Sequence, residues 1–164
     1  KVLEIFFENP SREFHLRELS RILKLSMPTI ISVTDALSKE GFIIKTKGKV
    51  LTTLKADREN VDFIRHKRVY NLEEIYNSGL IEFLTENYNY PKCITLFGSY
   101  SRGEDIEGSD IDIALVTNKR LELNLEKYDK LLERHINIHE ISLNKISVEF
   151  KANLWNGIVL EGSW

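Results

Sequence analysis

The stretch ITLFGSYSRGEDIEGSDIDIALV, residues 94–116, joins two apolar segments through a polar turn that contains glycine. Residues 94–97 predict a short strand that runs directly into Gly98 and Ser99, and a helix is expected to start within residues 100–104. The free N–H groups and the positive dipole end at such a helix start attract anions. Gly98 would let a phosphate approach the backbone closely, and the Ser99 hydroxyl adds a donor. The sequence therefore predicts a phosphate-binding turn.

Two aspartates follow this turn at a spacing that a strand makes meaningful. Ten residues separate Ser99 from Asp110, and Asp112 follows one residue later, within a second predicted strand over residues 111–116. Because side chains alternate along a strand, both carboxylates should point to one face of it. Two neighbouring carboxylates repel each other unless a cation such as Mg²⁺ lies between them. A metal site beside a phosphate cradle suits phosphoryl or nucleotidyl transfer.

This motif, Gly-Ser, ten residues, Asp-x-Asp, resembles that of the polymerase-β-like nucleotidyltransferase superfamily, specifically its minimal nucleotidyltransferase family. The resemblance runs from about residue 72 to residue 162 and implies an α+β domain with a small mixed sheet flanked by helices. It also implies ATP or another NTP as the substrate, and two Mg²⁺ ions bridged by Asp110 and Asp112. Nucleotide-binding roles are implied for Gly98, Ser99 and Arg102, although a plain surface position is an equally good interpretation of Arg102.

The sequence departs from that family at its third acid, which the family places on a later strand facing the pair. Here a helix predicted over residues 121–132 leads to a strand over residues 135–141. With the isoleucines of this strand inward, Asn137 and His139 face the site, whereas Glu140 has the opposite parity. Asn137 therefore stands at the third catalytic position, where its amide can coordinate Mg²⁺ but cannot accept a proton. His139 could act as a base; a structural histidine is the alternative.

The first third of the chain follows a different pattern. Apolar periodicity predicts, in order, a helix ending before residue 9, an extended piece at 14–16, helices at 17–23 and 28–40, and a hairpin of strands 42–45 and 50–54. In the helix over residues 17–23, Ile22 is among the residues expected to face inward. Ser26 is expected to cap the helix over residues 28–40.

This order resembles the winged helix-turn-helix domains of prokaryotic transcription factors, especially at residues 29–43. The resemblance implies that the helix over residues 28–40 enters the major groove of double-stranded DNA and presents Thr29 and Ser32 to it. The alternative is a domain used only for protein contacts or dimerisation, because this helix exposes no Arg, Asn or Gln for reading bases. On the wing, phosphate contacts are implied for Lys45, Lys47 and Lys49.

These patterns divide the chain into a winged helix over residues 1–56, a charged connector over 57–71 and a nucleotidyltransferase domain over 72–164. The last of these opens with a long amphipathic helix predicted over residues 72–88. Residues 1–56 carry 10 Lys and Arg against 6 Asp and Glu, whereas the remainder carries 13 against 19. The excess of positive charge in residues 1–56 fits a segment that binds a polyanion, and the excess of negative charge in the remainder fits a segment that binds cations.

Composition predicts the cellular compartment of the protein. Cys93 is the single cysteine among 164 residues, which excludes an intrachain disulfide and favours a reducing cytoplasm. No apolar run approaches the roughly 18 residues that span a bilayer, and no signal peptide pattern opens the sequence, so we expect no membrane partner.

Three functions remain open at this level. The first is an enzyme that transfers AMP from ATP to a protein or other hydroxyl, as an antitoxin would towards a HEPN-type toxin partner. The second is a DNA-binding regulator whose nucleotidyltransferase domain binds nucleotide but is catalytically impaired, which Asn137 favours. The third is an interaction module that neutralises a partner by binding alone. A homodimer would match a palindromic DNA site.

Overall fold

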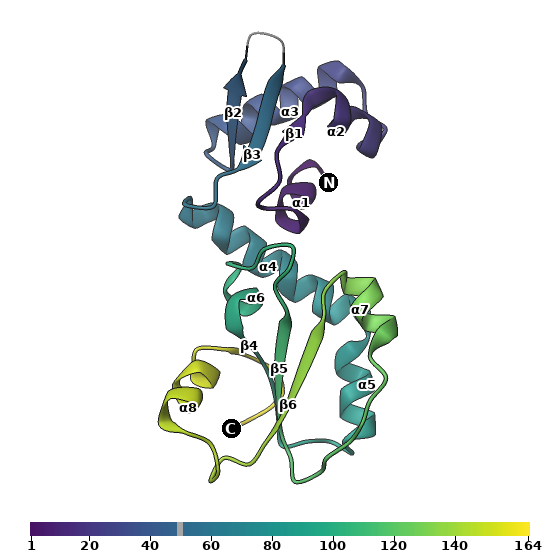
Figure 1. Cartoon of the computed structure of the whole chain (residues 1–164), viewed down its shortest axis with the longest axis vertical. Helices are drawn as coiled ribbons and strands as arrows, with labels where there is room; N and C mark the ends of the chain where they lie inside the picture. The colour runs from purple at the N-terminus through teal and green to yellow at the C-terminus, as the bar shows by residue number, and fades with distance from the viewer. Residues whose placement is uncertain (49–50) are drawn as a thin grey trace. The chain divides into compact units, whose positions relative to one another are not determined.

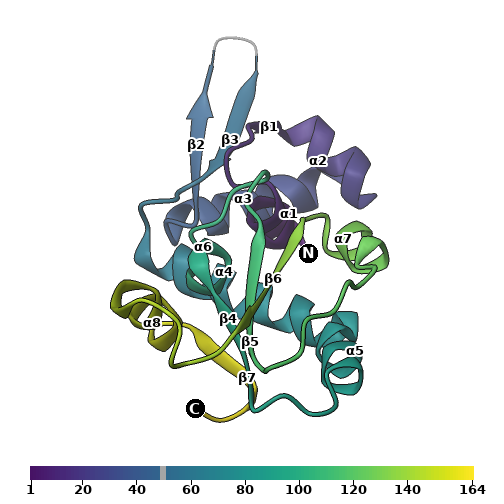
Figure 2. The same cartoon turned by 60° about the horizontal axis from the view of Figure 1, so that its bottom comes forward.

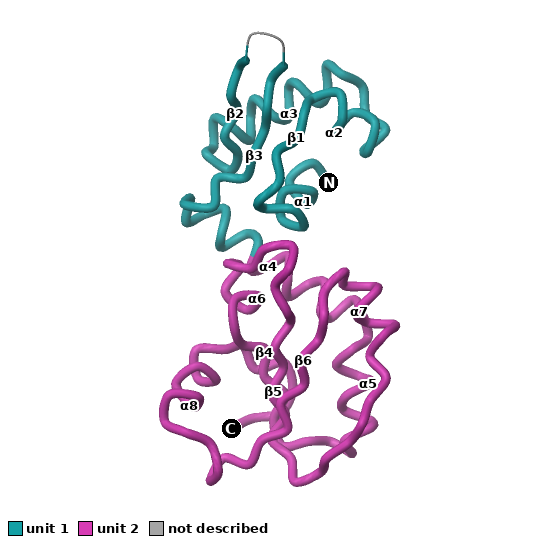
Figure 3. Tube along the Cα trace, in the orientation of Figure 1, with its two compact units in different colours: residues 1–67 teal, residues 68–164 magenta. Residues whose placement is uncertain are grey.

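The computed structural model of the chain describes residues 1–48 and 51–164 (Figure 1, with a turned view in Figure 2). It consists of two compact units, Lys1–Lys67 and Arg68–Trp164 (Figure 3). The boundary between them falls inside the predicted connector, residues 57–71, which is helical from Val61 onward. In the described part of the chain, no helix combines the length and the apolar character needed to cross a membrane.

The first unit has the element order that the sequence predicts. Its three-stranded antiparallel sheet has the strand order β1-β3-β2, and the β2–β3 hairpin pairs Ile43 with Ala56 and Lys47 with Thr52. The elements are α1 (Val2–Glu8), β1 (Phe14–His15), α2 (Leu16–Leu23), α3 (Met27–Lys39), β2 (Ile43–Lys47), β3 (Thr52–Ala56) and the start of α4 (Val61–Ser78).

Helix α3 begins as its sequence predicts. Ser26 is the N-cap, and its Oγ accepts a hydrogen bond from the backbone N–H of Thr29 at 3.3 Å. The preceding helix contains one wrong prediction, because Ile22 is 51% exposed. Helix α2 has only eight residues and buries Leu19 as its fully inward residue, so its last turn lies at the surface of the unit.

The second unit is built on a four-stranded sheet with the strand order β6-β5-β4-β7. Strand β4 is antiparallel to β5 and β7, and β5 is parallel to β6, which confirms the predicted mixed sheet. Its elements after α4 are α5 (Leu80–Asn87), β4 (Cys93–Phe97), α6 (Gly98–Arg102), β5 (Ile111–Val116), α7 (Glu126–Leu132), β6 (Ile136–Ile141), α8 (Val148–Trp155) and β7 (Ile158–Gly162).

Strand alternation sends two sets of side chains to opposite faces of this sheet. Ile111, Ile113 and Leu115 of β5 join a core with residues of α4, α5 and α7. Ala114, between them, packs on the other face with Leu154 of α8. The separation of α8 from α5 and α7 can be followed in Figure 2. Every even-numbered residue of β5 therefore lies on the α8 face.

Several helix boundaries differ from the predicted ones, beginning with α4, which starts at Val61 and not at residue 72. The helix predicted over residues 72–88 is two helices, because Gly79 adopts a positive φ of 75° and ends α4 before α5 begins. The helix predicted from residue 121 begins only at Glu126. Helix α6 starts at Gly98, earlier than the predicted residue 100, and ends at Arg102. The apolar spacing continues without interruption across Gly79, so periodicity alone does not reveal the turn between α4 and α5.

Candidate functional site

Asp110 and Asp112 lie at the start of β5, on the face of the sheet that α8 covers. They occupy the same parity as Ala114, and Ile111 between them is fully buried in the opposite core. The side chain of Asp112 is 29% exposed and Asp110 is an exposed residue, so solvent and solutes reach both carboxylates. The prediction that the two acids share a face is confirmed.

Gly98 brings the turn after β4 against the second of these acids. Phe97, the last residue of β4, pairs with Asp112 across the antiparallel ladder. Gly98 has a φ of 77°, and a Cβ built on it would lie 2.6 Å from Asp112 Oδ2. Glycine adopts this φ without strain, and any larger residue would also push the Asp112 carboxylate aside. The Gly-Ser turn and the acid pair are therefore one site.

Strand β6 supplies the other side of this site. The parallel ladder pairs Asp112 with Asn137. The Asn137 amide nitrogen Nδ2 donates to Asp110 Oδ2 at 2.9 Å and to Asp112 Oδ1 at 3.5 Å. One donor within reach of both carboxylates means that the two acids converge. The predicted placement of Asn137 opposite the acids is confirmed.

His139 approaches the same acid from two residues farther along β6. Its Nε2 lies 3.3 Å from Asp112 Oδ1, and its side chain is 38% exposed. Its ring meets Phe97 of β4 edge to face at a centroid distance of 5.1 Å and lies 6.0 Å from the ring of Phe150 in α8. These aromatic contacts orient the imidazole with one nitrogen towards the acid pair.

Glu140 lies on the opposite face of β6, as its parity predicts. Tyr88 donates its hydroxyl to Glu140 Oε1 at 2.6 Å, and the backbone N–H of Leu121 donates to the same oxygen at 2.7 Å. Burial and this hydrogen bond raise the pKa of the Tyr88 hydroxyl. Glu140 thus anchors the segment before α7 and cannot replace the missing third acid.

The donor set at the acid pair suits a divalent cation, which the nucleotidyltransferase resemblance implies. Two carboxylates converge on one point, and an amide and an imidazole stand across from them. As the side chains stand, no three His, Cys, Asp or Glu residues within 1–48 and 51–164 are grouped tightly enough to hold a metal. Asn137 would supply oxygen instead of nitrogen after a half-turn of its amide. Asp110, Asp112 and Asn137 are therefore the residues that would hold the ion.

The remaining predicted nucleotide-binding residues have different surroundings. Ser99 is half-buried in the first turn of α6, beside Gly98. Arg102, at the other end of that short helix, is 46% exposed at its side chain, and its Nε donates to Glu104 Oε2 at 2.7 Å. The ion pair favours the surface interpretation of Arg102 over a phosphate contact.

A buried polar group beneath the connecting loop was missed by sequence reasoning. Asp105 is 1% exposed, and the Asn71 amide donates to its Oδ1 at 2.7 Å and to the carbonyl oxygen of Tyr100 at 2.9 Å. Arg134 Nη2 lies 3.9 Å from Asp105 Oδ2. Burial, followed by the charge of Asp105, raises the pKa of the Tyr100 hydroxyl. In sequence, Asp105 is one more acid in an acidic loop, and nothing marks it as buried.

The predicted DNA-contacting residues of the first unit fall into two groups. Thr29 and Ser32 are exposed on α3, and Lys47 is exposed on β2. Lys45 is not a free cation, because its side chain is 10% exposed and its Nζ lies 2.7 Å from Asp35 Oδ1. Lys49 lies outside the described residues.

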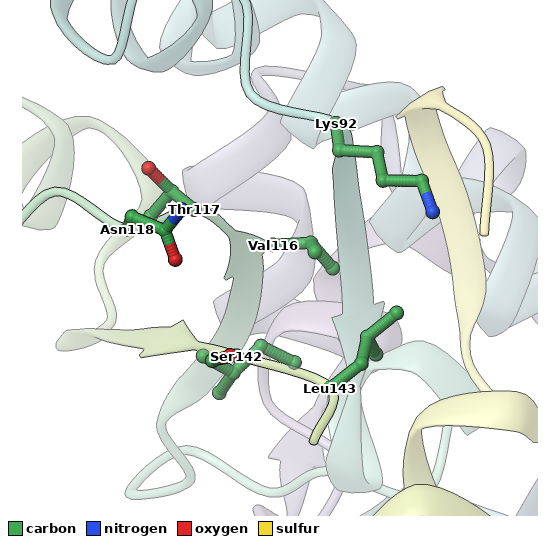
Figure 4. Close-up of a pocket in the computed structure, with 7 residues that line it drawn as sticks. Lys92, Val116, Thr117, Asn118, Ser142 and Leu143 are labelled. Carbon is green, nitrogen blue, oxygen red and sulfur yellow. The ribbon is translucent and has the colours of Figure 1, made fainter. Parts of the chain in front are cut away.

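A small cavity of about 200 Å³ occurs at the far end of the same sheet (Figure 4). Val116 and Thr117 at the end of β5 line it together with Lys92, whereas the acid pair lies at the start of that strand. Backbone hydrogen bonds from Lys92 to Val116 and from Thr117 to Ile141 close the sheet there. The cavity is therefore separate from the acid pair.

A mixed sheet that brings a Gly-Ser turn against two strand-borne aspartates is the arrangement of a nucleotidyltransferase domain. Residues 79–162, just over half of the chain, match the family described as Polymerase beta, Nucleotidyltransferase. The chain therefore belongs to the polymerase beta nucleotidyltransferase family.

The chain was also compared with curated protein sequences and with solved structures. No curated protein sequence matches it. Among solved structures, one described as "Crystal structure of the toxin-antitoxin with AMP-PNP" is similar at 29% sequence identity, covering 53% of this chain and 74% of the other, with a TM-score of 0.40.

Proposed function

We propose that the second unit binds a nucleoside triphosphate with divalent cations and transfers its nucleotidyl group, AMP in the case of ATP, to a hydroxyl. The observation that carries the proposal is the packing of Asp112 against Gly98, where a Cβ would come within 2.6 Å of the carboxylate. A carboxylate so close to a turn with free N–H groups places cation and phosphate ligands side by side. Such a pairing is what phosphoryl chemistry requires.

The residues divide the work by their chemistry. Ser99 and the backbone around Gly98 would hold the terminal phosphates, and Asp110 and Asp112 would hold the cations with Asn137. Bound divalent cations would lower the pKa of the attacking hydroxyl and neutralise charge on the leaving pyrophosphate. The acceptor oxygen forms a bond to the α-phosphorus, and the bond from that phosphorus to the bridging oxygen breaks. Asn137 cannot take the acceptor's proton, so that proton would pass to water, which can reach the exposed Asp110.

Calorimetric titration of the whole chain with ATP and with GTP, each with and without Mg²⁺, tests the binding step. We expect heat of binding that requires Mg²⁺ and that disappears when Asp110→Asn and Asp112→Asn are combined. Glu59→Gln plus Asp62→Asn, two exposed acids of the first unit, is the charge-matched control and should bind as the wild type does. Equal binding by the Asp110/Asp112 double variant would refute the metal site.

The second candidate is a regulator that binds nucleotide without transferring it. The specific observation in its favour is Asn137, which stands where a third acid is expected and donates to both aspartates. Incubation with labelled ATP, Mg²⁺ and host extract separates the two candidates. Label transferred to any acceptor by the wild type supports the enzyme, and label transferred only by Asn137→Asp supports the regulator.

We further propose that the first unit is a winged helix that binds double-stranded DNA. Exposed Thr29 and Ser32 on α3 and exposed Lys47 on the hairpin support it. Lys47→Ala should weaken duplex binding and reduce its salt dependence by about one phosphate contact. Lys45→Ala, which removes a cation already paired with Asp35, is the matched control and should leave the salt slope unchanged. A gel-shift series in which neither variant differs from wild type would remove the wing from the interface.

The acceptor remains a prediction from the family resemblance. A HEPN-type partner would supply a protein hydroxyl, and the same labelling experiment would show it as a modified band. Homodimerisation on DNA is a separate prediction, which sedimentation of the chain with and without a duplex would test.

A further inference from the structure

We propose that α3 of the first unit reads the C5-methyl groups of thymine in the major groove of DNA, with Ile31 as its main contact, so that the unit prefers A·T-rich duplexes. This inference rests on the proposed DNA binding of the first unit, and it names the bases that such binding would select. It assigns a role to Ile31, a large apolar side chain that is 40% exposed on a helix.

Helix α3 has the length and the open face that a groove contact needs. It has 13 residues and buries only Ile30 and Thr34, whereas α1 has 7 residues and buries four of them. The exposed residues of its first ten positions recur at spacings of three and four and therefore share one face. The major groove of B-DNA is wide enough to admit a helix that presents such a face. The residues of this face are Pro28, Thr29, Ile31, Ser32, Asp35 and Ala36.

The most polar groups on this face are already engaged within the first unit. Thr29 Oγ1 lies 2.8 Å from the Oγ of Ser26 in the helix cap. Asp35 Oδ1 lies 2.7 Å from Lys45 Nζ on the neighbouring strand β2. The cap leaves the γ-methyl group of Thr29 for a further contact, and the ion pair holds the carboxylate of Asp35 against β2. The face therefore offers a ligand mainly methyl groups.

Methyl groups select one feature of the base edges. Ile31 and Ala36 are exposed and end in methyl groups, and the hydroxyl of Ser32 can bond to several bases without discriminating between them. In the major groove, the C5-methyl of thymine is the apolar group that a base edge presents. Apolar side chains placed against a G·C pair would instead leave its donors and acceptors without partners. The chemistry of the face therefore favours thymine.

The charges around this face fit a polyanion. Residues 1–56 carry 10 Lys and Arg against 6 Asp and Glu. Exposed cations precede α3 at Arg21 and Lys24 and follow it on the hairpin at Lys47. A duplex presents phosphates and thymine methyl groups side by side, so it matches an apolar helix face that has cations on the segments before and after it. This match favours DNA over a protein partner as the occupant of the face.

Fluorescence anisotropy of labelled duplexes titrated with the whole chain tests the proposal. An alternating dA-dT duplex carries the methyl group and an alternating dA-dU duplex lacks it, while an alternating dG-dC duplex gains it when 5-methylcytosine replaces cytosine. At one fixed salt concentration, we expect each methylated duplex to bind more tightly. The expected gain is about fourfold for each methyl group contacted, which corresponds to about 0.8 kcal/mol of buried apolar surface. Equal Kd values within each pair of duplexes would overturn the proposal.

A pair of variants assigns the preference to α3. Ile31→Ala should remove about fourfold from the ratio of the dA-dU to the dA-dT Kd, because it removes the largest apolar contact. Ile22→Ala is the matched control, since Ile22 is 51% exposed on α2 and the same groups are deleted. It should keep the wild-type ratio. A ratio that is unchanged in Ile31→Ala, or that falls equally in both variants, would contradict the role of Ile31.

Failure of this inference and failure of the proposed DNA binding are distinguishable. If the duplexes bind in a salt-dependent way but the methyl group has no effect, DNA binding stands and the reading of thymine falls. If no duplex binds, the proposed DNA binding falls and this inference falls with it. Sedimentation in which the chain self-associates, and in which Ile31→Ala dissociates it, would then assign the face to a second copy of the chain.

Discussion

Asn137→Asp replaces the amide nitrogen at the centre of the site with a carboxylate oxygen and should make the stability of the second unit depend more strongly on divalent cations. In the wild type, the amide donates to Asp110 at 2.9 Å and to Asp112 at 3.5 Å. A hydrogen bond to a charged group contributes about 1.5–3 kcal/mol, and the longer of these two contributes less. The variant loses both bonds and places a third carboxylate against the other two.

The repulsion can be bounded from the same geometry. Like charges about 4 Å apart repel by about 1 kcal/mol in water and about 4 kcal/mol near a protein surface of lower effective dielectric. Because Asp110 is exposed and the Asp112 side chain is 29% exposed, the lower half of that range applies. Together with the lost hydrogen bonds, we expect the variant without divalent cations to be less stable by about 3 kcal/mol. For a unit of this size, the melting temperature should fall by about 12–24 °C.

Divalent cations should restore the variant, because three carboxylates attract a cation more strongly than two. Thermal unfolding in EDTA and in excess Mg²⁺ measures both effects, and the Mg²⁺-dependent gain should be larger for Asn137→Asp than for the wild type. Asn118→Asp adds the same charge at an exposed position beyond the other end of β5 and should respond to neither condition. The reasoning is refuted if Asn137→Asp melts like the wild type in EDTA, or if Mg²⁺ leaves the difference between them unchanged.

Two further substitutions test the frame around the site. Gly98→Ala should abolish cation binding in calorimetry and destabilise the unit by about 1–3 kcal/mol, because it combines a positive φ with a clash against Asp112. Gly79→Ala, which has a similar φ but no atom within 4 Å of the added Cβ, isolates the backbone part, and equal loss of cation binding in both would rule out the clash. Asn71→Leu should reduce the free energy of unfolding by about 3 kcal/mol, since it strips hydrogen bonds from the buried Asp105. Asn77→Leu, exposed on the same helix, is its control, and denaturant curves that coincide for the two would contradict a structural role for Asn71.

Short-range sequence patterns were sufficient to predict which face of the sheet the site residues on β5 and β6 occupy. The two-residue spacing of Asp110 and Asp112 places both carboxylates on one face whatever the rest of the chain does. The same rule set Asn137 towards the acids and Glu140 away from them, and both placements agree with the hydrogen bonds found. The mixed sheet followed from the family resemblance of the Gly-Ser and Asp-x-Asp motif rather than from periodicity.

Long-range packing decided what local patterns cannot encode. Nothing in the sequence distinguishes Lys45 from the other wing lysines, but in the fold it forms an ion pair with Asp35 of α3. Nothing marks Asp105 as buried either, and its hydrogen-bond partner Asn71 lies more than thirty positions earlier in the chain. Leu72 to Tyr88 keep one apolar spacing through Gly79, so only the backbone shows where the helix breaks. The orientation of His139 likewise depends on Phe97 and Phe150, which come from two other elements. Periodicity sets which way a side chain points, but charge pairing, burial and ligand sets depend on segments that meet only after folding.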